Sequence, residues 1–291
     1  MKSYDIRFPC LNSEDYDKWI SAHVVQPDLI DDRTGAMLLN HGWGGNRFQY
    51  RDIQQDYCDR YNLVTICTEY RQSGFDFDPV TGLGAYRPYD FSHLQVFDCL
   101  IALRTVLDLL GRINRRRLFM FGGSQGGHIA ALGTAFAPNT FALAQIVSAI
   151  SYPAPEQRVW AGRTFSQDEL DVRNALRLAK LVRNPFVIMH GTADQTVAEA
   201  HSRKLEQALR TAHVPVTARY YEGGDHGLAP VTTRHEATTE LAGEMLRTLE
   251  TDGRTDFDRE SLVRVACTDL ELRIDWSKAG NDLSLVRWIE R

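Results

Sequence analysis

The segment 117–133 most constrains how this chain can fold. Residues 117–121 form a short apolar block typical of a buried parallel strand, and residues 129–133 begin a helix rich in small side chains. Between them, Gly122-x-Ser124-x-Gly126 has the pattern of a nucleophile elbow, in which glycines let the backbone turn tightly and present a strained serine to a cleft. A glycine-rich turn without chemistry fits this pattern equally well. The rest of the chain must therefore decide between the two interpretations.

Apolar blocks and helical patterns alternate through the centre of the chain. Strands are expected at 36–40, 63–67, 117–121, 142–149, 185–189 and 216–221, and helices at 93–110, 198–211 and 232–249, besides the one after the elbow. This alternation predicts an α/β fold, with a mostly parallel sheet covered by helices on both faces and sites at the carboxyl ends of its strands. Two short strands at 4–8 and 19–25 are expected to pair with each other in antiparallel fashion and to lead into this sheet.

Two stretches interrupt this alternation. Residues 72–89 form a long loop of aromatic and charged side chains, and loops of that length in compact domains often serve binding. Residues 151–182 begin with proline-flanked turns and become helical around 168–181, which fits a small cap over a cleft and an ordinary crossover helix equally well. The candidate pocket residues, from these stretches and from the loop after strand 36–40, are Trp43, Phe75, Tyr86, Tyr152 and Trp160.

The tail of the chain has a different pattern. Apolar and polar residues alternate over 270–276, and a turn at 278–282 leads to a second strand at 283–289. A hairpin with one apolar face needs a partner, either the amino-terminal strands or a second subunit, so a homo-oligomer through the terminal strands is one expectation. We therefore expect a catalytic domain over 1–250 and a β-hairpin extension over 251–291, packed on that domain or on a partner subunit.

Composition excludes several classes of protein. A hydrophobic content of 43% and a charged content of 24% are ordinary for a globular chain, and no stretch has the length of a membrane span. The net charge of −5 argues against nucleic acid as the main partner. We interpret Arg115-Arg116-Arg117 as a solvated segment that precedes the next strand, and not as a phosphate-binding patch. Five scattered cysteines without a C-x-x-C pair, and no apolar leader, predict a reducing, cytoplasmic environment.

A serine nucleophile needs a histidine base and a carboxylate that orients it, which on this fold follow in the order serine, acid, histidine. Asp194 is the first carboxylate after strand 185–189, and His226 lies in a glycine loop after the next strand. Asp225 is a rival acid, but adjacent side chains in an extended loop normally diverge. The other acid position, after strand 142–149, offers only the more distant Glu156. We therefore favour Asp194.

Acyl transfer also needs donors for a tetrahedral oxyanion. The backbone N–H of Gln125 directly follows the nucleophile at the start of a helix, and the Trp43 N–H lies in the loop after an earlier strand. These two groups are the candidate oxyanion donors. No metal or organic cofactor is implied, because the sequence His235-Glu236-Ala237-Thr238-Thr239 lacks the second histidine of a zinc-binding H-E-x-x-H motif.

Four motifs together carry a resemblance to a known family. HGWGG, GGSQGG, HGTAD and GGDHG resemble the α/β-hydrolase superfamily over residues 36–249. Within this superfamily, the chain most resembles the prolyl oligopeptidase catalytic domains and the acetyl-xylan or cephalosporin esterases. These proteins share a second glycine after the elbow, here Gly127. This resemblance implies a catalytic triad of Ser124, Asp194 and His226.

The expected function is that of a serine hydrolase. We expect cleavage of a carboxylic ester, as in an esterase or deacetylase, through an acyl-Ser124 intermediate that water resolves. The alternatives are a small peptidase or amidase of the prolyl oligopeptidase type that takes a short peptide, and an acyltransferase that uses the same triad. A non-catalytic binding protein on the same scaffold is less favoured, because all three triad candidates are present.

Overall fold

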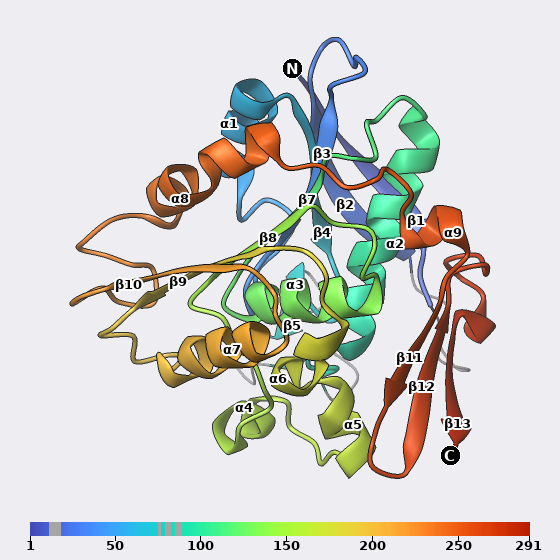
Figure 1. Ribbon diagram of the computed structural model, residues 1–291, viewed down its shortest axis with the longest axis vertical. Coiled ribbons are helices and arrows are strands. Elements are labelled where there is room, and N and C mark those ends of the chain that lie inside the picture. The colour runs from blue at the N-terminus through green and yellow to red at the C-terminus, as the bar shows by residue number, and fades with distance from the viewer. Residues whose placement is uncertain (12–18, 75–76, 79–82, 85–88) are drawn as a thin grey trace.

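The computed structural model describes residues 1–11, 19–74, 77–78, 83–84 and 89–291. In this part of the chain an eight-stranded sheet has the order β1-β2-β4-β3-β7-β8-β9-β10, so β7 (Leu118–Gly123) lies near its centre (Figure 1). The other strands are β1 (Lys2–Pro9), β2 (Trp19–Gln26), β3 (Gly35–Asn40), β4 (Leu63–Glu69), β8 (Leu143–Val147), β9 (Phe186–Gly191) and β10 (Val216–Tyr221). Within this sheet, every neighbouring pair from β4 through β3, β7, β8 and β9 to β10 is parallel. The pairs β1–β2 and β2–β4 are antiparallel. The expected sheet is thus confirmed.

Helices cover both faces of this sheet (Figure 1). One face carries α1 (Arg51–Tyr61) and α8 (Arg234–Thr248), and the other carries α2 (His93–Leu110), α3 (Gln125–Phe136) and α7 (Ala200–Thr211). Successive side chains of a strand point to opposite faces, so Leu38 and Leu39 enter separate apolar cores. Each fully buried leucine of this kind contributes about 1.5–3 kcal/mol. The continuous apolar runs in the sequence follow from this double burial.

The helix after the elbow is the most enclosed element. Every residue of α3 is buried, because it lies between the sheet and α2. A helix that is buried on all sides is expected to be apolar or small-sided all round, and Ala130, Ala131 and Gly133 meet that requirement. A Cβ at Gly133 would lie 2.9 Å from Cε of Met120, so the helix packs directly on the strand beneath it.

The segment 151–182 forms several short helices. They are α4 (Pro155–Trp160), α5 (Gln167–Val172), α6 (Ala175–Leu178) and the 3₁₀ turn η2 (Ala179–Leu181). The segment is helical around 168–181, as expected, but the helix is interrupted at Arg173 and Asn174. Arg173 turns into the interior, and the Asn174 side chain accepts hydrogen bonds from the N–H groups of Leu176 and Arg177, which starts a new helix. Whether these helices act as a cap stays a prediction.

The carboxyl-terminal tail forms a small antiparallel sheet. After α9 (Asp256–Arg259), the strands β11 (Leu262–Ala266), β12 (Leu270–Asp275) and β13 (Val286–Glu290) pair in that order, with η3 (Leu283–Leu285) before the last. The expected hairpin is β12–β13, and β11 is an addition to it. The sheet packs beside α2 and α3 of its own chain, where the buried Trp276 donates its indole N–H to the Phe136 carbonyl at 2.9 Å (Figure 1).

A second small pair of strands, β5 (Phe77–Asp78) and β6 (Leu83–Gly84), lies within the expected long loop. Residues 12–18, between the first two strands, and most of the loop 72–89 fall outside the described residues. Within the described part of the chain, no helix combines the length and apolar character that crossing a membrane requires. All five cysteines are buried.

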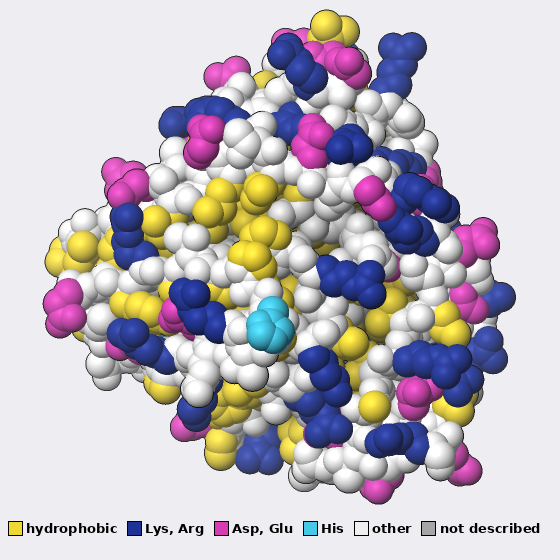
Figure 2. Space-filling model, in the orientation of Figure 1, with side chains coloured by type: hydrophobic (Ala, Val, Ile, Leu, Met, Phe, Trp, Pro, Cys, Tyr) yellow, Lys and Arg dark blue, Asp and Glu magenta, His cyan; other side chains and the backbone are white. Residues whose placement is uncertain are grey.

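Charged side chains of both signs intermingle on the face shown in Figure 2, as expected for 33 basic and 38 acidic residues. The basic run before β7 takes part in the fold. Arg115 pairs with Asp258 at 2.5 Å, and Arg116 pairs with Glu250 at 2.7 Å. Arg117 is buried and donates to backbone carbonyls of α1 and α8. The interpretation of Arg117 as solvated was therefore wrong, because its guanidinium joins the ends of two helices.

Candidate active site

The turn between β7 and α3 places Ser124 at a strand end. Its backbone has φ 58° and ψ −123°, a conformation that a non-glycine residue rarely adopts. The turn is tight because a Cβ on Gly122 would collide with the Gly126 carbonyl, and a Cβ on Gly126 with the carbonyl of Asn40. Both positions therefore require glycine. Ser124 is partly exposed while its neighbours in the turn are buried, which is the geometry of a nucleophile elbow.

Asp194 and His226 come together although they are far apart in sequence. Asp194 follows β9 and His226 follows β10, and the distance from His226 Nδ1 to Asp194 Oδ2 is 2.7 Å. The Asp194 side chain is fully buried, whereas that of His226 is 25% exposed. A carboxylate at Nδ1 favours the tautomer with a proton there, which leaves Nε2 free to accept one. The pair thus has the arrangement of a general base and its orienting acid.

Four donors surround the Asp194 carboxylate. Oδ1 accepts from the N–H groups of Thr196 (2.8 Å) and Val197 (3.0 Å), and Oδ2 lies 3.1 Å from His190 Nε2 besides its contact with His226. Burial alone would raise the pKa of Asp194, but the hydrogen bonds from His190, His226 and the Val197 N–H outweigh it and hold that pKa well below its ordinary value. Asp194 is therefore a carboxylate at neutral pH.

The rival acid, Asp225, serves its own loop. Its Oδ1 accepts from the N–H groups of Gly227 at 2.7 Å and Ala229 at 2.9 Å, and so closes the turn that carries His226. Glu156 is exposed in α4. Of the three carboxylates weighed from the sequence, the structure brings Asp194 to the His226 ring.

The two candidate oxyanion donors belong to segments that meet at Ser124. Gln125 is the first residue of α3, where backbone N–H groups point away from the helix. The loop of Trp43 approaches from β3, since a Cβ on Gly42 would lie 3.5 Å from Cβ of Ser124. Both backbone N–H groups thus belong to turns beside the candidate nucleophile, as an oxyanion hole requires.

A buried polar network supports this turn, and sequence reasoning missed it. The Gln125 side chain accepts from the Tyr89 hydroxyl at 2.8 Å and donates to Gln95 Oε1 at 2.8 Å. His128, one turn later in α3, contacts the Ser92 hydroxyl at 3.0 Å and the Arg173 carbonyl at 2.6 Å. A carbonyl only accepts, so His128 carries its proton on Nε2. Burial lowers the pKa of His128 to about 3, which keeps the ring neutral.

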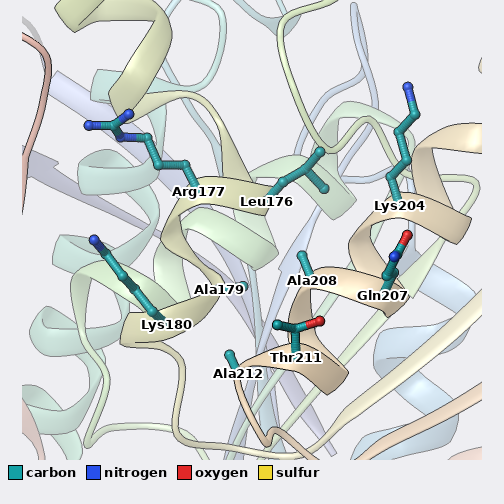
Figure 3. A pocket seen from close by; sticks show the side chains of 9 residues that line it. All are labelled: Leu176, Arg177, Ala179, Lys180, Lys204, Gln207, Ala208, Thr211 and Ala212. Carbon is teal, nitrogen blue, oxygen red and sulfur yellow. The ribbon is translucent and has the colours of Figure 1, made fainter.

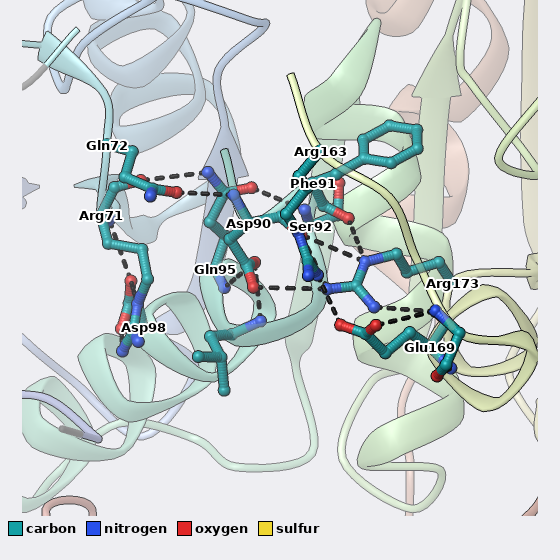
Figure 4. Close-up of polar contacts among 12 residues, drawn as sticks. Arg71, Gln72, Asp90, Phe91, Ser92, Gln95, Asp98, Arg163, Glu169 and Arg173 are labelled. Carbon is teal, nitrogen blue, oxygen red and sulfur yellow. Dashed lines mark hydrogen bonds and ion pairs between the residues drawn. The ribbon is translucent and has the colours of Figure 1, made fainter. Parts of the chain in front are cut away.

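The fully buried Arg173 ties the segment 151–182 to the start of α2 (Figure 4). Its guanidinium donates to the carbonyls of Asp90, Phe91 and Glu169 at 2.8–3.1 Å. Burial lowers the pKa of Arg173 to about 10, although the nearby Asp90 carboxylate opposes that shift. The Asp90 carboxylate also accepts from two backbone N–H groups at the start of α2. This network fixes the segment 151–182 against the start of α2.

The predicted pocket residues divide into three groups. Trp43 and Trp160 meet edge to face at 5.8 Å, and Trp43 stacks on Tyr89 at 4.0 Å, so these two indoles join the loop after β3 to α4. Tyr152 belongs to another cluster, since it stacks on His201 at 4.3 Å and accepts from Lys204 at 3.0 Å. Phe75 and Tyr86 lie outside the described residues.

Two shallow grooves of the described surface are not lined by the triad candidates. One, of about 500 Å³, runs between α6 and α7; Leu176 and three alanines line it, with Arg177, Lys180 and Lys204 at its rim (Figure 3). The other, of about 470 Å³, lies beside α4 and extends to Phe165. Neither contains Ser124, Asp194 or His226.

One cluster in the described residues has potential metal ligands. Oxygen atoms of Asp168 and Asp171 and the Cys267 sulfur lie within 4.8 Å of one another. Asp168 accepts from the N–H groups of Asp269 and Leu270, and Asp171 accepts from the Thr268 hydroxyl at 2.8 Å. Because these carboxylates bind the turn between β11 and β12, the cluster joins α5 to the carboxyl-terminal sheet.

Comparison with protein families places this geometry in context. The sequence model of the family described as the prolyl oligopeptidase family matches residues 92–243, just over half of the chain. Human prolyl endopeptidase FAP is 28% identical over 149 residues, which are 48% of this chain and 20% of that protein. The chain thus spans about a fifth of the length of the curated relatives it matches.

Solved structures share the fold. Acylaminoacyl peptidase from Pyrococcus horikoshii aligns with a TM-score of 0.68 at 16% identity, over 86% of this chain and 42% of that one. S-formylglutathione hydrolase from Agrobacterium tumefaciens aligns with a TM-score of 0.66 at 19% identity, over 84% of this chain and 95% of that one. At these identities the likeness concerns the fold, and it confirms the expected α/β-hydrolase architecture.

Proposed function

The chain belongs to the prolyl oligopeptidase family of serine hydrolases, and we propose that it cleaves the carbonyl–nitrogen bond of a short peptide or an acylated amine. The relatives named above favour this peptidase activity over the ester hydrolysis expected first from the sequence, since one is a prolyl endopeptidase and another an acylaminoacyl peptidase. Ester cleavage is the second candidate, supported by a fold match that spans 95% of an S-formylglutathione hydrolase.

The observation that carries the proposal is the 2.7 Å contact between Asp194 and His226, which follow β9 and β10 at the same edge of the parallel sheet where Ser124 follows β7. In the proposed mechanism, Ser124 Oγ attacks the substrate carbonyl carbon while His226 Nε2 takes the hydroxyl proton. The Asp194 carboxylate stabilises the imidazolium that forms. The oxyanion of the tetrahedral intermediate accepts hydrogen bonds from the N–H groups of Gln125 and Trp43.

Collapse of this intermediate breaks the carbonyl–nitrogen bond, and the His226 imidazolium gives its proton to the departing amine. The product is an acyl-Ser124 ester. Water then attacks that ester, His226 takes a proton from the water, and the proton returns to Ser124 Oγ as the carboxylic acid leaves. An ester substrate follows the same steps with an alcohol as the leaving group. The indoles of Trp43 and Trp160 are proposed to contact the acyl side chain.

The test compares matched pairs of aminoacyl p-nitroanilides and p-nitrophenyl esters with the same acyl group. We expect turnover of the anilides, and we expect Ser124→Ala to reduce kcat by roughly 10⁶-fold, a loss typical of removing a triad nucleophile. Ser3→Ala, in β1, is the matched control and should retain activity. Hydrolysis of the esters alone would favour the second candidate, and full activity in Ser124→Ala would reject the serine mechanism.

A further inference from the structure

Arg234 holds the loop that carries His226. It is the first residue of α8, and its Nη2 donates to the His226 carbonyl oxygen at 2.7 Å. The start of α8 is itself fixed, because the Thr233 side chain accepts from the Glu236 N–H and the Glu236 carboxylate accepts from the Thr233 N–H. The guanidinium therefore approaches the histidine loop from a rigid helix end.

The same guanidinium reaches the elbow. A Cβ on Gly123, the residue before Ser124, would lie 3.2 Å from Arg234 Nη1 and 2.6 Å from the Tyr50 hydroxyl oxygen. The Tyr50 ring packs edge-on against Phe121 of β7 at 5.0 Å. Arg234 thus lies between the turn with the candidate nucleophile and the turn with the candidate base.

The other contacts of the histidine loop join it to itself and to the turn after β9, where the Ala193 N–H donates to the Gly224 carbonyl at 2.9 Å. Asp225 bonds Gly227 and Ala229 within the same turn, so it shapes the turn without attaching it to the elbow. Asp194 holds the imidazole through Nδ1, and Arg234 holds the main chain of the same residue through its carbonyl. Two anchors, one on the ring and one on the backbone, together restrict how His226 can rotate.

We infer, on the basis of the proposed function, that Arg234 is a positioning residue for the hydrolysis. It sets the placement of His226 relative to Ser124 and does not contact the substrate. Displacement of a reacting group by about 1 Å can cost on the order of 100-fold in rate. Loss of the Arg234 contact should therefore lower kcat and leave KM nearly unchanged.

The test uses Arg234→Met, which keeps most of the side-chain length and removes the donors, and Arg234→Lys, which restores a donor. We expect kcat to fall roughly 10- to 100-fold in Arg234→Met and to recover in part in Arg234→Lys. The proton NMR signal of the His226 Nδ1–H, at low field because of its bond to Asp194, should broaden or shift in Arg234→Met. Arg247→Met is the matched control, since Arg247 lies on the same helix and bonds the Gly243 carbonyl.

A wild-type kcat and an unchanged low-field signal in folded Arg234→Met would overturn the inference. If Arg234→Met does not fold, as judged by circular dichroism, Arg234→Leu, which also lacks a donor, takes its place under the same criteria. The low-field signal is measured without substrate, so it reports on the positioning even if the proposed activity is wrong. Failure of the proposed function would instead appear as full activity in Ser124→Ala.

Discussion

Asp194 and Asp225 are both close to His226 in the fold, yet their carboxylates have different partners. Asp194 accepts from the histidine ring, and Asp225 accepts from backbone N–H groups of the loop. An asparagine can replace Asp225 in those contacts, because its side-chain oxygen is also an acceptor. It cannot replace Asp194, because an amide does not stabilise an imidazolium and favours the wrong tautomer of the histidine.

Asp194→Asn should therefore lower kcat on the order of 10⁴-fold, while Asp225→Asn should change it by less than about 10-fold. Steady-state kinetics on the substrate found in the anilide and ester comparison measures both variants. Equal losses in the two variants would mean that the acid has been assigned incorrectly.

The sequence predicts Ser124, Asp194 and His226 because each lies in a short motif directly after an apolar strand. Arg234 and Tyr50 carry no such local signal, since their partners belong to other segments. His190 is different, because it opens the HGTAD motif and was within reach of sequence reasoning. The structure places its Nε2 3.1 Å from Asp194 and its Nδ1 2.7 Å from the Ser202 hydroxyl.

Element boundaries are predicted well where local sequence signals decide them. The helix expected at 93–110 coincides with α2, because Ser92 and Gln95 form a capping box and Gly111 ends the helix. The break between α5 and α6 escapes prediction, because the inward turn of Arg173 depends on carbonyl groups of a distant segment. Helical propensity along 168–181 gives no sign of that tertiary contact.

The buried histidine of α3 gives a prediction about pH. Burial lowers the pKa of His128 to about 3 and that of His41 and His201 to about 4, below the ordinary value of 6.5. As the pH falls, these histidines therefore bind protons in the unfolded chain at a higher pH than in the folded chain. The stabilisation is fully present above about pH 6.5 and is lost as the pH falls toward 4, at about 1.4 kcal/mol per pH unit for each histidine.

Urea denaturation between pH 7 and about 4.5 should therefore show a falling free energy of unfolding, and His128→Gln should make that slope shallower by about 1.4 kcal/mol per pH unit. The control is His213→Gln, because His213 is exposed in the fold as it is in the unfolded chain. A slope that His128→Gln leaves unchanged would contradict a neutral, buried His128.

The carboxyl-terminal sheet belongs to the main apolar core. Trp276 is fully buried, meets the Phe257 ring at 4.8 Å and the Phe97 ring at 6.2 Å, and joins the same cluster as α2 and α3. The sequence indicated the hairpin through its alternating pattern but left its partner open between the amino-terminal strands and a second subunit. Its contacts here are with the helices of its own chain, a long-range arrangement that no local pattern encodes.

Trp276→Ala should lower the free energy of unfolding by about 3–5 kcal/mol, through lost burial and the cavity that remains. Trp288→Ala, at a position that is 36% exposed, should cost clearly less. Thermal or urea denaturation of both variants measures the difference. A loss below about 1 kcal/mol for Trp276→Ala would show that the sheet is only loosely attached.

Arg173 also sets a limit on recombination among relatives of this protein. Its guanidinium requires backbone carbonyls at positions 90 and 91, and its own carbonyl meets His128 of α3. A chimaera that imports segment 151–182 alone would separate a buried cation from the main chain shaped to receive it. The segment that can be exchanged is therefore discontinuous, with 151–182 and the entry to α2 transplanted together.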